Sequence, residues 1–486
     1  MSKKETTLKQ KCIIIVIIYA VAALIFWLCA NEQLNYRVDE TNMLQNETVI
    51  GEITSDTVFT QSFKAADNGD LLSITLLMAT YGRENNSTVV FTVLDGDDIL
   101  SSQTINTIGM IDNSNYTVNF EQPPKLRKDE IYTLKITSPD GIGGNGVTIY
   151  SGTAYEAGKV SVAADLSEEM QTHLNGAPLG YSLCMYITTR TYLTFGKLYP
   201  VFAVVIGLVL VIYCVYMVSR EKNGKSCLGN KFISAFTKYR YLIKQLVMRD
   251  FKTKYKRSVL GVLWSFLNPL LMMIVQYIVF STLFKSSIEN FALYLLIGIV
   301  CFNFFTECAG MCLGSITGNA SLITKVYMPK YIYPVSRMLS SGINLGFSLI
   351  PLLGVMLITQ APFTKTLALL PIPLICLFAF SLGIGMILAT MMVFFRDTQF
   401  LWGVISTIWM YATPIIYPES ILPQDYMTIF KLNPMYHIVR MVRTMLMDGV
   451  SPEPKAYGIT ILMSFLTLLI GAAIFKRNQD KFVLNL

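Results

Sequence analysis

The sequence is short of charged residues. Asp, Glu, Lys and Arg make up 15% of its 486 residues, whereas soluble domains carry roughly 25%. A globule of this length with so few charges lacks the polar groups to cover its surface, and 53% of the residues are hydrophobic. These values exclude a soluble globular protein and predict a membrane protein.

Histidine and cysteine are scarce as well. The two histidines, His173 and His437, are far apart in the sequence, and no group of Cys and His residues has the spacing of metal ligands. We therefore predict no metal site and no metalloenzyme. Of nine cysteines, only Cys184 lies between residues 31 and 196, so that segment has no disulfide framework and is expected to fold on its core alone.

A nucleotide-binding site is also missing. Gly224, Lys225 and Ser226 form the only Gly-Lys-Ser in the chain, but Ser219 stands where a P-loop needs its first glycine. The tripeptide also follows an apolar run and not a strand. If ATP drives this protein, a separate chain has to bind the ATP and Mg.

Long apolar runs are abundant. The first run ends in FWLCANE, which contains no small-x-small cleavage site. A retained anchor is therefore preferred over the alternative of a cleaved signal peptide. Eight uncharged runs are long enough to cross about 30 Å of hydrocarbon. The eight predicted spans are residues 12–30, 198–218, 259–284, 290–306, 338–363, 366–395, 398–418 and 456–475.

Charge is distributed unevenly along the chain. Residues 31–196 contain 9 basic and 21 acidic residues, whereas the rest of the chain contains 30 basic and 11 acidic ones. Lysines precede the first span, and twelve Lys or Arg lie between Arg220 and Arg257. Because basic segments stay in the cytoplasm, we predict cytoplasmic N- and C-termini, with residues 31–196 outside a bacterial cytoplasmic membrane.

The acidic outer segment is predicted to be an all-β sandwich. Apolar and polar residues alternate in 88–98, 131–141 and 181–193, and the first two stretches end in Asp-Gly turn signals. A segment of about 165 residues with several short strands favours two packed antiparallel sheets. The pattern loosely resembles jelly-roll glycan-binding modules.

Glycan binding by this segment would use exposed tyrosines that stack on sugar rings, although packing at the sandwich edge is the alternative. The negative charge favours a neutral or mildly charged glycan over a polyanion. Calcium bound by a cluster of aspartates would reverse that preference, and docking of a protein partner is another open role. The candidate tyrosines are Tyr81, Tyr116 and Tyr155, and the aspartates are Asp95, Asp97 and Asp98.

Residues 231–258 predict a cytoplasmic amphipathic helix in the headgroup plane. Apolar residues such as Phe236 recur at helical spacing, and polar residues that include Arg249 occupy the other faces, with Asp250 next to it. A plain basic flank is the alternative, but it would not need the apolar stripe. In the next span, Pro269 interrupts the helix a third of the way in.

Four motifs in order resemble the membrane subunit of type-2 ABC exporters, in particular permeases that export O-antigen, capsule or teichoic-acid polymers on a lipid carrier. They are LVMRDFKTKYKRSVLGVLWSFLNPLL, SLITKVYMPKYIYPVSRMLS, FFRDTQ, and ATPIIYP followed by LNPMYHIVRMVR. The resemblance covers about residues 231–486 and leaves residues 1–230 outside. It implies six spans in the exporter core, a homodimer, two separate ATPase subunits and a lipid-linked polysaccharide as the substrate. Membrane lipids are further partners, and no nucleic acid is expected.

The resemblance also implies that two short cytoplasmic loops contact the ATPase. The first is expected to be helical, like the coupling helix of the family, and the second holds an Arg-Asp pair. An ordinary basic loop and a plain turn are the alternatives. The residues concerned are Lys325, Val326, Tyr327, Met328 and Pro329 in the first loop, and Arg396 and Asp397 in the second.

Prolines break the backbone near the C-terminus. Pro414 and Pro418 end the seventh span, and an Asn-Pro pair that ends at Pro434 signals a new helix. Irregular backbone at membrane depth must be buried in protein or line a watery cavity, and residues 414–447 resemble the re-entrant half-helices at the exit of the family. The candidates to meet the substrate pyrophosphate or an acidic sugar there, or alternatively lipid phosphate, are Arg440 and Arg443.

A substrate path is expected to contain aromatic side chains, although packing or lipid contact is the alternative for each. Glu307 differs from them, because it is the only charged residue between Glu289 and Lys325 and an ionisable residue within a span indicates function. A position near the cytoplasmic end, in contact with water, is its alternative. The candidate path residues are Trp264, Tyr277, Phe302, Phe305, Glu307, Trp402, Trp409 and Tyr411.

The sequence thus predicts an α-helical polytopic membrane protein of about eight spans, with an all-β sandwich between spans one and two. Export of a drug or small lipid, a surface sensor and a membrane-embedded transferase are the alternative functions. The predicted segments are a tail and first anchor (1–30), the sandwich (31–196), a second anchor (197–220), the interfacial helix (221–258) and a six-span permease domain (259–486).

Overall fold

The chain forms two compact units. One unit comprises Leu34–Phe195, and the other comprises Met1–Gln33 together with Gly196–Leu486. Each unit has a hydrophobic core of its own. The computed structural model describes residues 8–42, 48–152, 172–178, 182–223, 227–256, 259–283, 290–325, 328–421 and 426–485.

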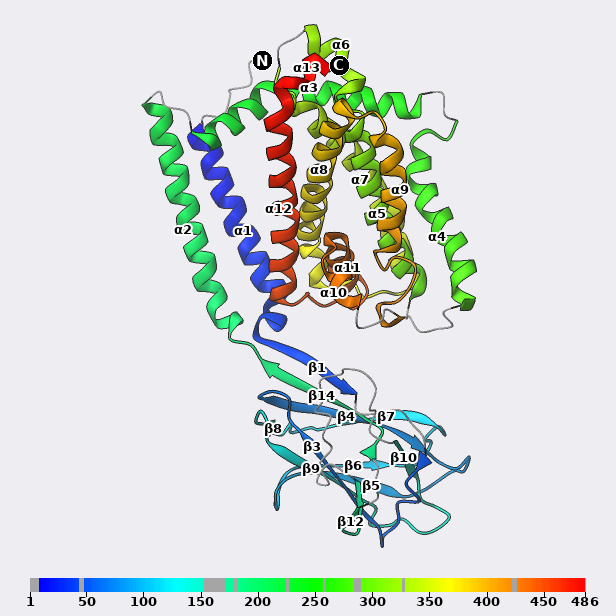
Figure 1. Ribbon diagram of the computed structural model, residues 1–486. Coiled ribbons are helices and arrows are strands. Elements are labelled where there is room, and N and C mark those ends of the chain that lie inside the picture. Colours follow the sequence, from blue (N-terminus) through cyan, green and yellow to red (C-terminus); the bar gives the residue numbers. More distant parts are fainter. Residues whose placement is uncertain are drawn as a thin grey trace. The chain divides into compact units, whose positions relative to one another are not determined.

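The first unit is built of antiparallel strands in two sheets (Figure 1). One sheet has the order β1-β14-β4-β10-β13, with β2 beside β10 and with β7 and β8 beside β4. The other has the order β12-β11-β3-β9-β5-β6. The strands are β1 (Tyr36–Asn42), β2 (Thr48–Val49), β3 (Val58–Lys64), β4 (Gly69–Ala79), β5 (Thr88–Asp95), β6 (Asp98–Asn106), β7 (Ser114–Asn119), β8 (Lys125–Leu126), β9 (Ile131–Thr137), β10 (Thr148–Gly152), β11 (Thr172–Leu174), β12 (Ala177–Pro178), β13 (Ser182–Leu183) and β14 (Met185–Tyr192).

The two sheets bury their inner faces against each other. In β9, Tyr132, Leu134 and Ile136 are buried while the residues between them are partly exposed, as the period-two pattern predicts. They share one core with Leu71 and Ile74 of β4 in the other sheet. The prediction of an all-β sandwich is therefore confirmed.

The second unit is helical. Seven helices in the described part of the chain are long and apolar enough to cross a membrane, and they match seven of the eight predicted spans. They are α1 (Leu8–Asn35), α2 (Phe195–Lys222), α4 (Trp264–Leu283), α5 (Phe291–Leu313), α7 (Ile332–Ile358), α8 (Pro371–Phe394) and α12 (Pro454–Asn478). The other helices are α3 (Leu228–Tyr255), α6 (Ala320–Lys325), α9 (Thr398–Tyr411), α10 (Met427–Lys431), α11 (Pro434–Leu446) and α13 (Phe482–Asn485), with short 3-10 turns at Gly261–Leu263, Thr317–Asn319, Lys365–Leu369, Glu419–Ile421 and Gln479–Lys481.

The prediction of an eighth helical span at 398–418 is wrong in its length. Helix α9 has 14 residues, which at 1.5 Å per residue make about 21 Å and fall short of about 30 Å of hydrocarbon. It ends before Pro414, because a residue that precedes proline disfavours the helical conformation. The chain then continues through irregular backbone and the short α10 to α11, at the end of the helical unit opposite α6 and α13 (Figure 1).

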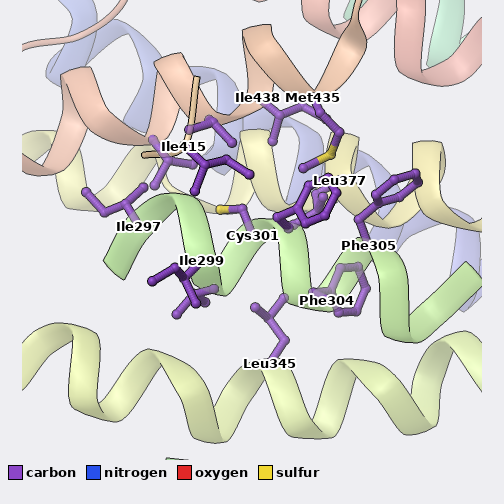
Figure 2. Packing of buried hydrophobic residues seen from close by; sticks show 14 of the residues in the cluster. Ile297, Ile299, Cys301, Phe304, Phe305, Leu345, Leu377, Ile415, Met435 and Ile438 are labelled. Carbon is purple, nitrogen blue, oxygen red and sulfur yellow. The ribbon is translucent and has the colours of Figure 1, made fainter. Parts of the chain in front are cut away.

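Helix α5 lies at the centre of the helical unit. Sixteen of its 23 residues are buried, which fits a helix that is apolar on every side. Figure 2 shows α5 between two other parts of the helical unit. One is α7, which contributes Leu345, and the other is the segment 414–447, called the exit segment below, which contributes Ile415, Met435 and Ile438. Most side chains on α5 are therefore in contact with other parts of the helical unit.

Helix α3 has the predicted apolar stripe. Ile243, Leu246 and Val247 are buried in a core that also contains Tyr333 of α7, while Lys244 is exposed. The side chain of Phe236 lies outside the described residues. The amphipathic character of this segment is confirmed, and its place in the headgroup plane stays a prediction.

The two N-terminal anchors are joined by hydrogen bonds in both directions. Tyr19 of α1 donates to the Ala203 carbonyl at 2.7 Å, and Tyr199 of α2 donates to the Ala23 carbonyl at 2.9 Å. The ring of Phe26 also meets the ring of Tyr457 in α12 at 5.0 Å. Helices α1 and α2 therefore form a hydrogen-bonded pair that contacts the rest of the helical unit.

Candidate functional site

A cavity of about 660 Å³ lies where α3 ends against α4, α5 and α7. Most of its lining residues have polar side chains, although three of these helices are apolar enough to span a membrane. Polar groups at such a place indicate function, because they are costly in a lipid environment. The cavity is lined by Lys254, Tyr255, Trp264, Ser265, Asn268, Pro269, Asn303, Thr306, Glu307, Asn344 and Ser348.

Glu307 is the acidic group of this cavity, and 29% of its side chain is exposed. The Lys254 ammonium lies 2.6 Å from Glu307 Oε1, and the Asn344 amide donates to the same oxygen at 2.6 Å. Tyr255 donates to Asn344 Oδ1 at 3.0 Å and so orients that amide. The last turn of the interfacial helix therefore supplies the counter-charge for the carboxylate that the sequence singled out.

Pro269 opens the backbone beside the cavity. Proline has no N–H, so the carbonyl of Ser265, four residues earlier, loses its helical partner. Ser348 of α7 donates to that carbonyl at 3.2 Å, and the Ser265 hydroxyl contacts the Tyr255 hydroxyl. Helix α4 continues through Pro269, so the predicted interruption is one lost backbone hydrogen bond and not a break.

A second polar cluster lies one turn earlier on α3, at Asp250. Only 4% of the Asp250 side chain is exposed, and its two oxygens lie 3.1 Å from Arg249 Nη2 and 2.9 Å from Arg337 Nη1 of α7. Both Nη atoms of Arg249 also donate to Asn319 Oδ1 at 3.2 Å. Asn319 immediately precedes α6, so this cluster ties α3, α7 and the start of α6 together.

The first predicted coupling loop contains the short helix α6, as expected. Ile323 anchors it in the core shared with α3, and Lys325 at its end is exposed. Met328 and Pro329 are partly exposed, whereas Val326 and Tyr327 lie outside the described residues.

The second predicted loop lies between α8 and α9. Arg396 and Asp397 are both exposed there, and no ion pair joins them in the part of the chain that the structure describes. Their contact with a partner stays a prediction.

Arg443 was predicted to meet the substrate at the exit, but its side chain points into the protein. The residue is buried in α11, and its guanidinium donates to the carbonyls of Pro414 at 2.6 Å, Ile415 at 3.0 Å and Tyr294 at 3.2 Å. Its charged group also lies 3.3 Å from the centre of the Tyr294 ring. The carbonyls of Pro414 and Ile415 belong to the proline-broken backbone, so Arg443 stabilises the irregular segment, and both of its Nη groups are used in these contacts.

Asn433 completes the same junction. Its Oδ1 accepts from the Met435 N–H at 3.0 Å, which is the predicted cap at the start of α11. The same oxygen accepts from Trp409 Nε1 at 2.8 Å, and its amide donates to the Ala412 carbonyl at 3.1 Å. By contrast, Arg440 is exposed and lies 3.9 Å from Glu419, so it is the arginine of this segment that can meet a ligand.

Comparison with known proteins decides the family. The family model for ABC-2 type transporters matches residues 241–447. The O-antigen export system permease protein RfbA of Klebsiella pneumoniae is 30% identical over 247 residues, which cover 50% of this chain and 95% of that protein. The chain belongs to the ABC-2 type transporter family.

Other relatives in the ABC-2 family agree. The O-antigen export system permease protein RfbA of Myxococcus xanthus is 29% identical over 256 residues, covering 52% of this chain and 98% of that protein. The polysialic acid transport protein KpsM of Escherichia coli is 22% identical over 255 residues, covering 51% of this chain and 97% of that protein. The cavity, the Asp250 cluster and Arg443 all lie inside the ABC-2 match, whereas the β unit lies before it.

The predicted path aromatics of this ABC-2 permease are in different surroundings. Phe305 packs against the rings of Phe380, Trp402 and Trp409 at 5.0 to 5.8 Å, and Phe302 is buried beside it. These rings fill the core of the chain, which is the alternative considered for them, and they do not line the cavity. Trp264 does line the cavity, and Tyr277 and Tyr411 are exposed.

The predicted glycan tyrosines of the β unit also differ from one another. Tyr81 is exposed on the loop after β4, with the Arg83 guanidinium 5.0 Å from its ring. Tyr116 was expected to be exposed but packs against the sandwich core, and Tyr155 lies outside the described residues. Asp95 and Asp98 flank the predicted hairpin turn, and no acidic group in the described residues is arranged to hold a metal ion.

Sequence reasoning did not single out most of the polar residues of these clusters. Lys254 is one of the basic residues that follow the second anchor, although its side chain reaches Glu307. Arg337 and Asn344 are not among the predicted site residues. The signal for Asn344 was present, because a polar side chain within a span usually pairs with another helix.

Proposed function

We propose that this chain is the permease subunit of an ATP-driven exporter that moves a lipid-linked polysaccharide across the cytoplasmic membrane, working as a homodimer with two ATPase subunits. The observation that carries the proposal is the share of each relative's length that aligns with this chain. Permeases named for O-antigen export and polysialic acid transport align over 95–98% of their length with the half of this chain that contains the polar cavity. ATP and Mg would be bound by the partner.

The orientation follows from charge. The basic N-terminal tail, the basic α3 and the basic end of α12 are placed in the cytoplasm by the positive-inside rule. The acidic β unit, between α1 and α2, is then outside. The exit segment with α10 and α11 lies on the outer side as well.

Coupling to ATP hydrolysis runs through α6 in this proposal. The ATPase pushes on α6 and on the Arg396 loop. Asn319, at the start of α6, is bonded to Arg249 and through it to the buried Asp250. A displacement of α6 therefore moves the end of α3, which holds Lys254 against Glu307.

The cavity receives the polar head of the substrate. Lys254 provides a positive charge, and Asn268, Asn303 and Ser348 provide groups that bond phosphate or hydroxyl oxygens. An incoming anion competes with Glu307 for Lys254, because both bind the same ammonium. Arrival of the substrate is thereby linked to the position of α3.

The β unit holds the glycan on the outer side. Its excess of acidic residues favours a neutral or mildly charged polysaccharide over a polyanion. The outer sandwich is joined to the permease at both ends, so it cannot diffuse away from the exit.

Depletion of the protein in its source organism tests the proposal. We expect lipid-linked polysaccharide to accumulate on the cytoplasmic face and to disappear from the surface, with recovery by the wild-type chain and not by Glu307→Lys. Unchanged surface polysaccharide, together with loss of drug resistance or of a short lipid from the outer leaflet, would contradict it. That outcome would favour the alternative of a drug or lipid exporter.

A further inference from the structure

Three tyrosines lie on the outer face of the larger sheet, on the two strands that lead to the anchors. Tyr36 of β1 and Tyr192 of β14 are direct partners across the antiparallel pair. Tyr186 lies six residues before Tyr192, and successive even-numbered positions of a strand share one face. The inner face of the same strand buries Met185 and Ile187, so these tyrosines are not part of the core.

Two of the three rings are exposed, and two are held by polar neighbours. Tyr186 is 37% exposed and Tyr192 is 59% exposed. The Tyr192 hydroxyl donates to Asp70 at 2.6 Å, and the guanidinium of Arg190 lies 4.8 Å from the Tyr36 ring. These contacts orient Tyr36 and Tyr192 and so reduce the entropy that is lost when a ligand binds, and Arg190 lies over one face of the Tyr36 ring.

The opposite outer face of the sandwich is different. On the smaller sheet, Thr92 and Ser102 are hydrogen-bonded across β5 and β6, and Ser62 and Thr133 are bonded across β3 and β9. That face carries hydroxyls and Lys135 where the larger sheet carries aromatic rings. The row of three tyrosines is therefore a feature of one outer sheet face and not of both.

Chain connectivity relates these tyrosines to the membrane. Tyr36 is six residues after Ala30 and Tyr192 is six residues before Leu198, where the predicted apolar runs end and begin. Six residues span at most about 22 Å. Along β14, Tyr186 lies about 20 Å from Tyr192, at about 3.4 Å per residue.

We propose that Tyr36, Tyr186 and Tyr192 form a binding face for a neutral glycan chain, and that they hold the sugars closest to the lipid anchor as the polysaccharide emerges. Sugar rings present flat C–H faces that stack on aromatic rings. Arg190 and Asp70, which are direct partners across β14 and β4 on this face, carry opposite charges, so the face selects a neutral chain. This inference rests on the proposed function for the identity of the ligand and adds its place on the β unit.

Photo-crosslinking in cells that make the full exporter tests the face directly. A benzophenone amino acid at position 186 should form an adduct that stains for carbohydrate. The same group at Thr92, on the opposite outer face, is the control and should give none. An adduct with lipid or protein alone at position 186, or an equal carbohydrate adduct at position 92, would overturn the proposal.

Binding to the purified full chain in nanodiscs gives a second readout. The probe is the surface polysaccharide of the source organism, released from its lipid. Tyr186→Ala should weaken binding roughly three- to tenfold, the range expected for one aromatic contact, whereas Thr92→Ala, on the opposite outer face, should leave it unchanged. Equal affinity of Tyr186→Ala and the parent would overturn the proposal.

The two proposals fail differently. Surface polysaccharide in cells with the parent chain tests export, and carbohydrate capture at position 186 tests the tyrosine face. Normal export without capture leaves the permease function intact and removes only the binding face. Capture that requires a working exporter supports both.

Discussion

Asp250 and Arg337 form a buried ion pair, with 2.9 Å between Oδ2 and Nη1. The pair joins α3 to α7, and Arg249 extends it to Asn319 before α6. Three elements at this end of the helical unit are thereby linked through one carboxylate.

Replacement of this carboxylate should therefore be severe. Asp250→Asn leaves Arg337 without its counter-charge, and we expect the free energy of unfolding to fall by about 3 kcal/mol or more. Heat- or detergent-induced unfolding of the purified permease measures it. Asp397→Asn, at an exposed position, is the control. Equal stability of the two variants would show that the Asp250–Arg337 pair does not contribute to the free energy of unfolding.

The Lys254–Glu307 pair should matter for transport more than for folding. Lys254→Met removes the cation that faces the cavity, and we expect export to fall by on the order of tenfold while the complex with the ATPase still assembles. Exchange of the two charges should restore part of the activity. Lys252→Met, at an exposed position on the same helix, should behave like the parent.

If the charge exchange restores nothing and Lys252→Met is equally defective, the pair is not the relevant interaction. Loss of assembly in Lys254→Met would instead make the pair structural.

Arg443 should be needed for folding of the exit segment and not for substrate contact. Arg443→Met removes the hydrogen bonds from the guanidinium to three carbonyl oxygens, and a hydrogen bond to a charged group contributes about 1.5–3 kcal/mol. We expect low yields of folded protein and early proteolysis between Pro414 and Pro434. Arg440→Met should fold normally, and a well-folded Arg443→Met variant that only binds substrate less tightly would contradict the account.

The β unit should lose stability in acid. Hydrogen bonding by Arg83 lowers the pKa of Glu52, and the backbone N–H groups of Thr80 and Thr88 lower the pKa of Asp112 and Asp140. A carboxylate whose pKa is lower in the folded state stabilises that state above its unfolded pKa, and this contribution is lost as the pH falls below about 4. Unfolding of the β unit measured from pH 7 to pH 2 should show this loss.

Arg83→Met isolates one of these carboxylates. Without the guanidinium, the pKa of Glu52 returns towards its ordinary value, so the acid transition should move to higher pH. Arg127→Met, which removes a long 3.6 Å contact with Glu130 at the surface, should leave it in place. A transition that does not move in either variant would contradict the assignment.

The sequence was sufficient for the elements whose signals are local. Period-two alternation identified β9 and its buried face, and long apolar runs identified seven of the spans. The Asn-Pro signal identified the start of α11, because the cap bond from Asn433 to Met435 is local. In each case the deciding interaction lies within a few residues.

Contacts between distant segments were not predictable in the same way. Arg440 and Arg443 are three residues apart, yet one is exposed and the other satisfies carbonyls of Pro414 and Tyr294. In the sequence, Lys254 is one of twelve basic residues between Arg220 and Arg257, and its contact with Glu307 is visible only in the folded structure. Residue type alone did not distinguish these positions, since burial depends on which helices pack together.

Reconstitution tests the central claim most directly. The purified chain is placed in vesicles with and without its proposed ATPase partner, and lipid-linked polysaccharide is supplied on one side. We expect no ATP hydrolysis by the permease alone, hydrolysis stimulated by the glycan lipid in the complex, and ATP-dependent transfer of the glycan to the opposite side. Hydrolysis by the permease alone, or transfer of a drug or short lipid with no transfer of the polysaccharide, would contradict the account.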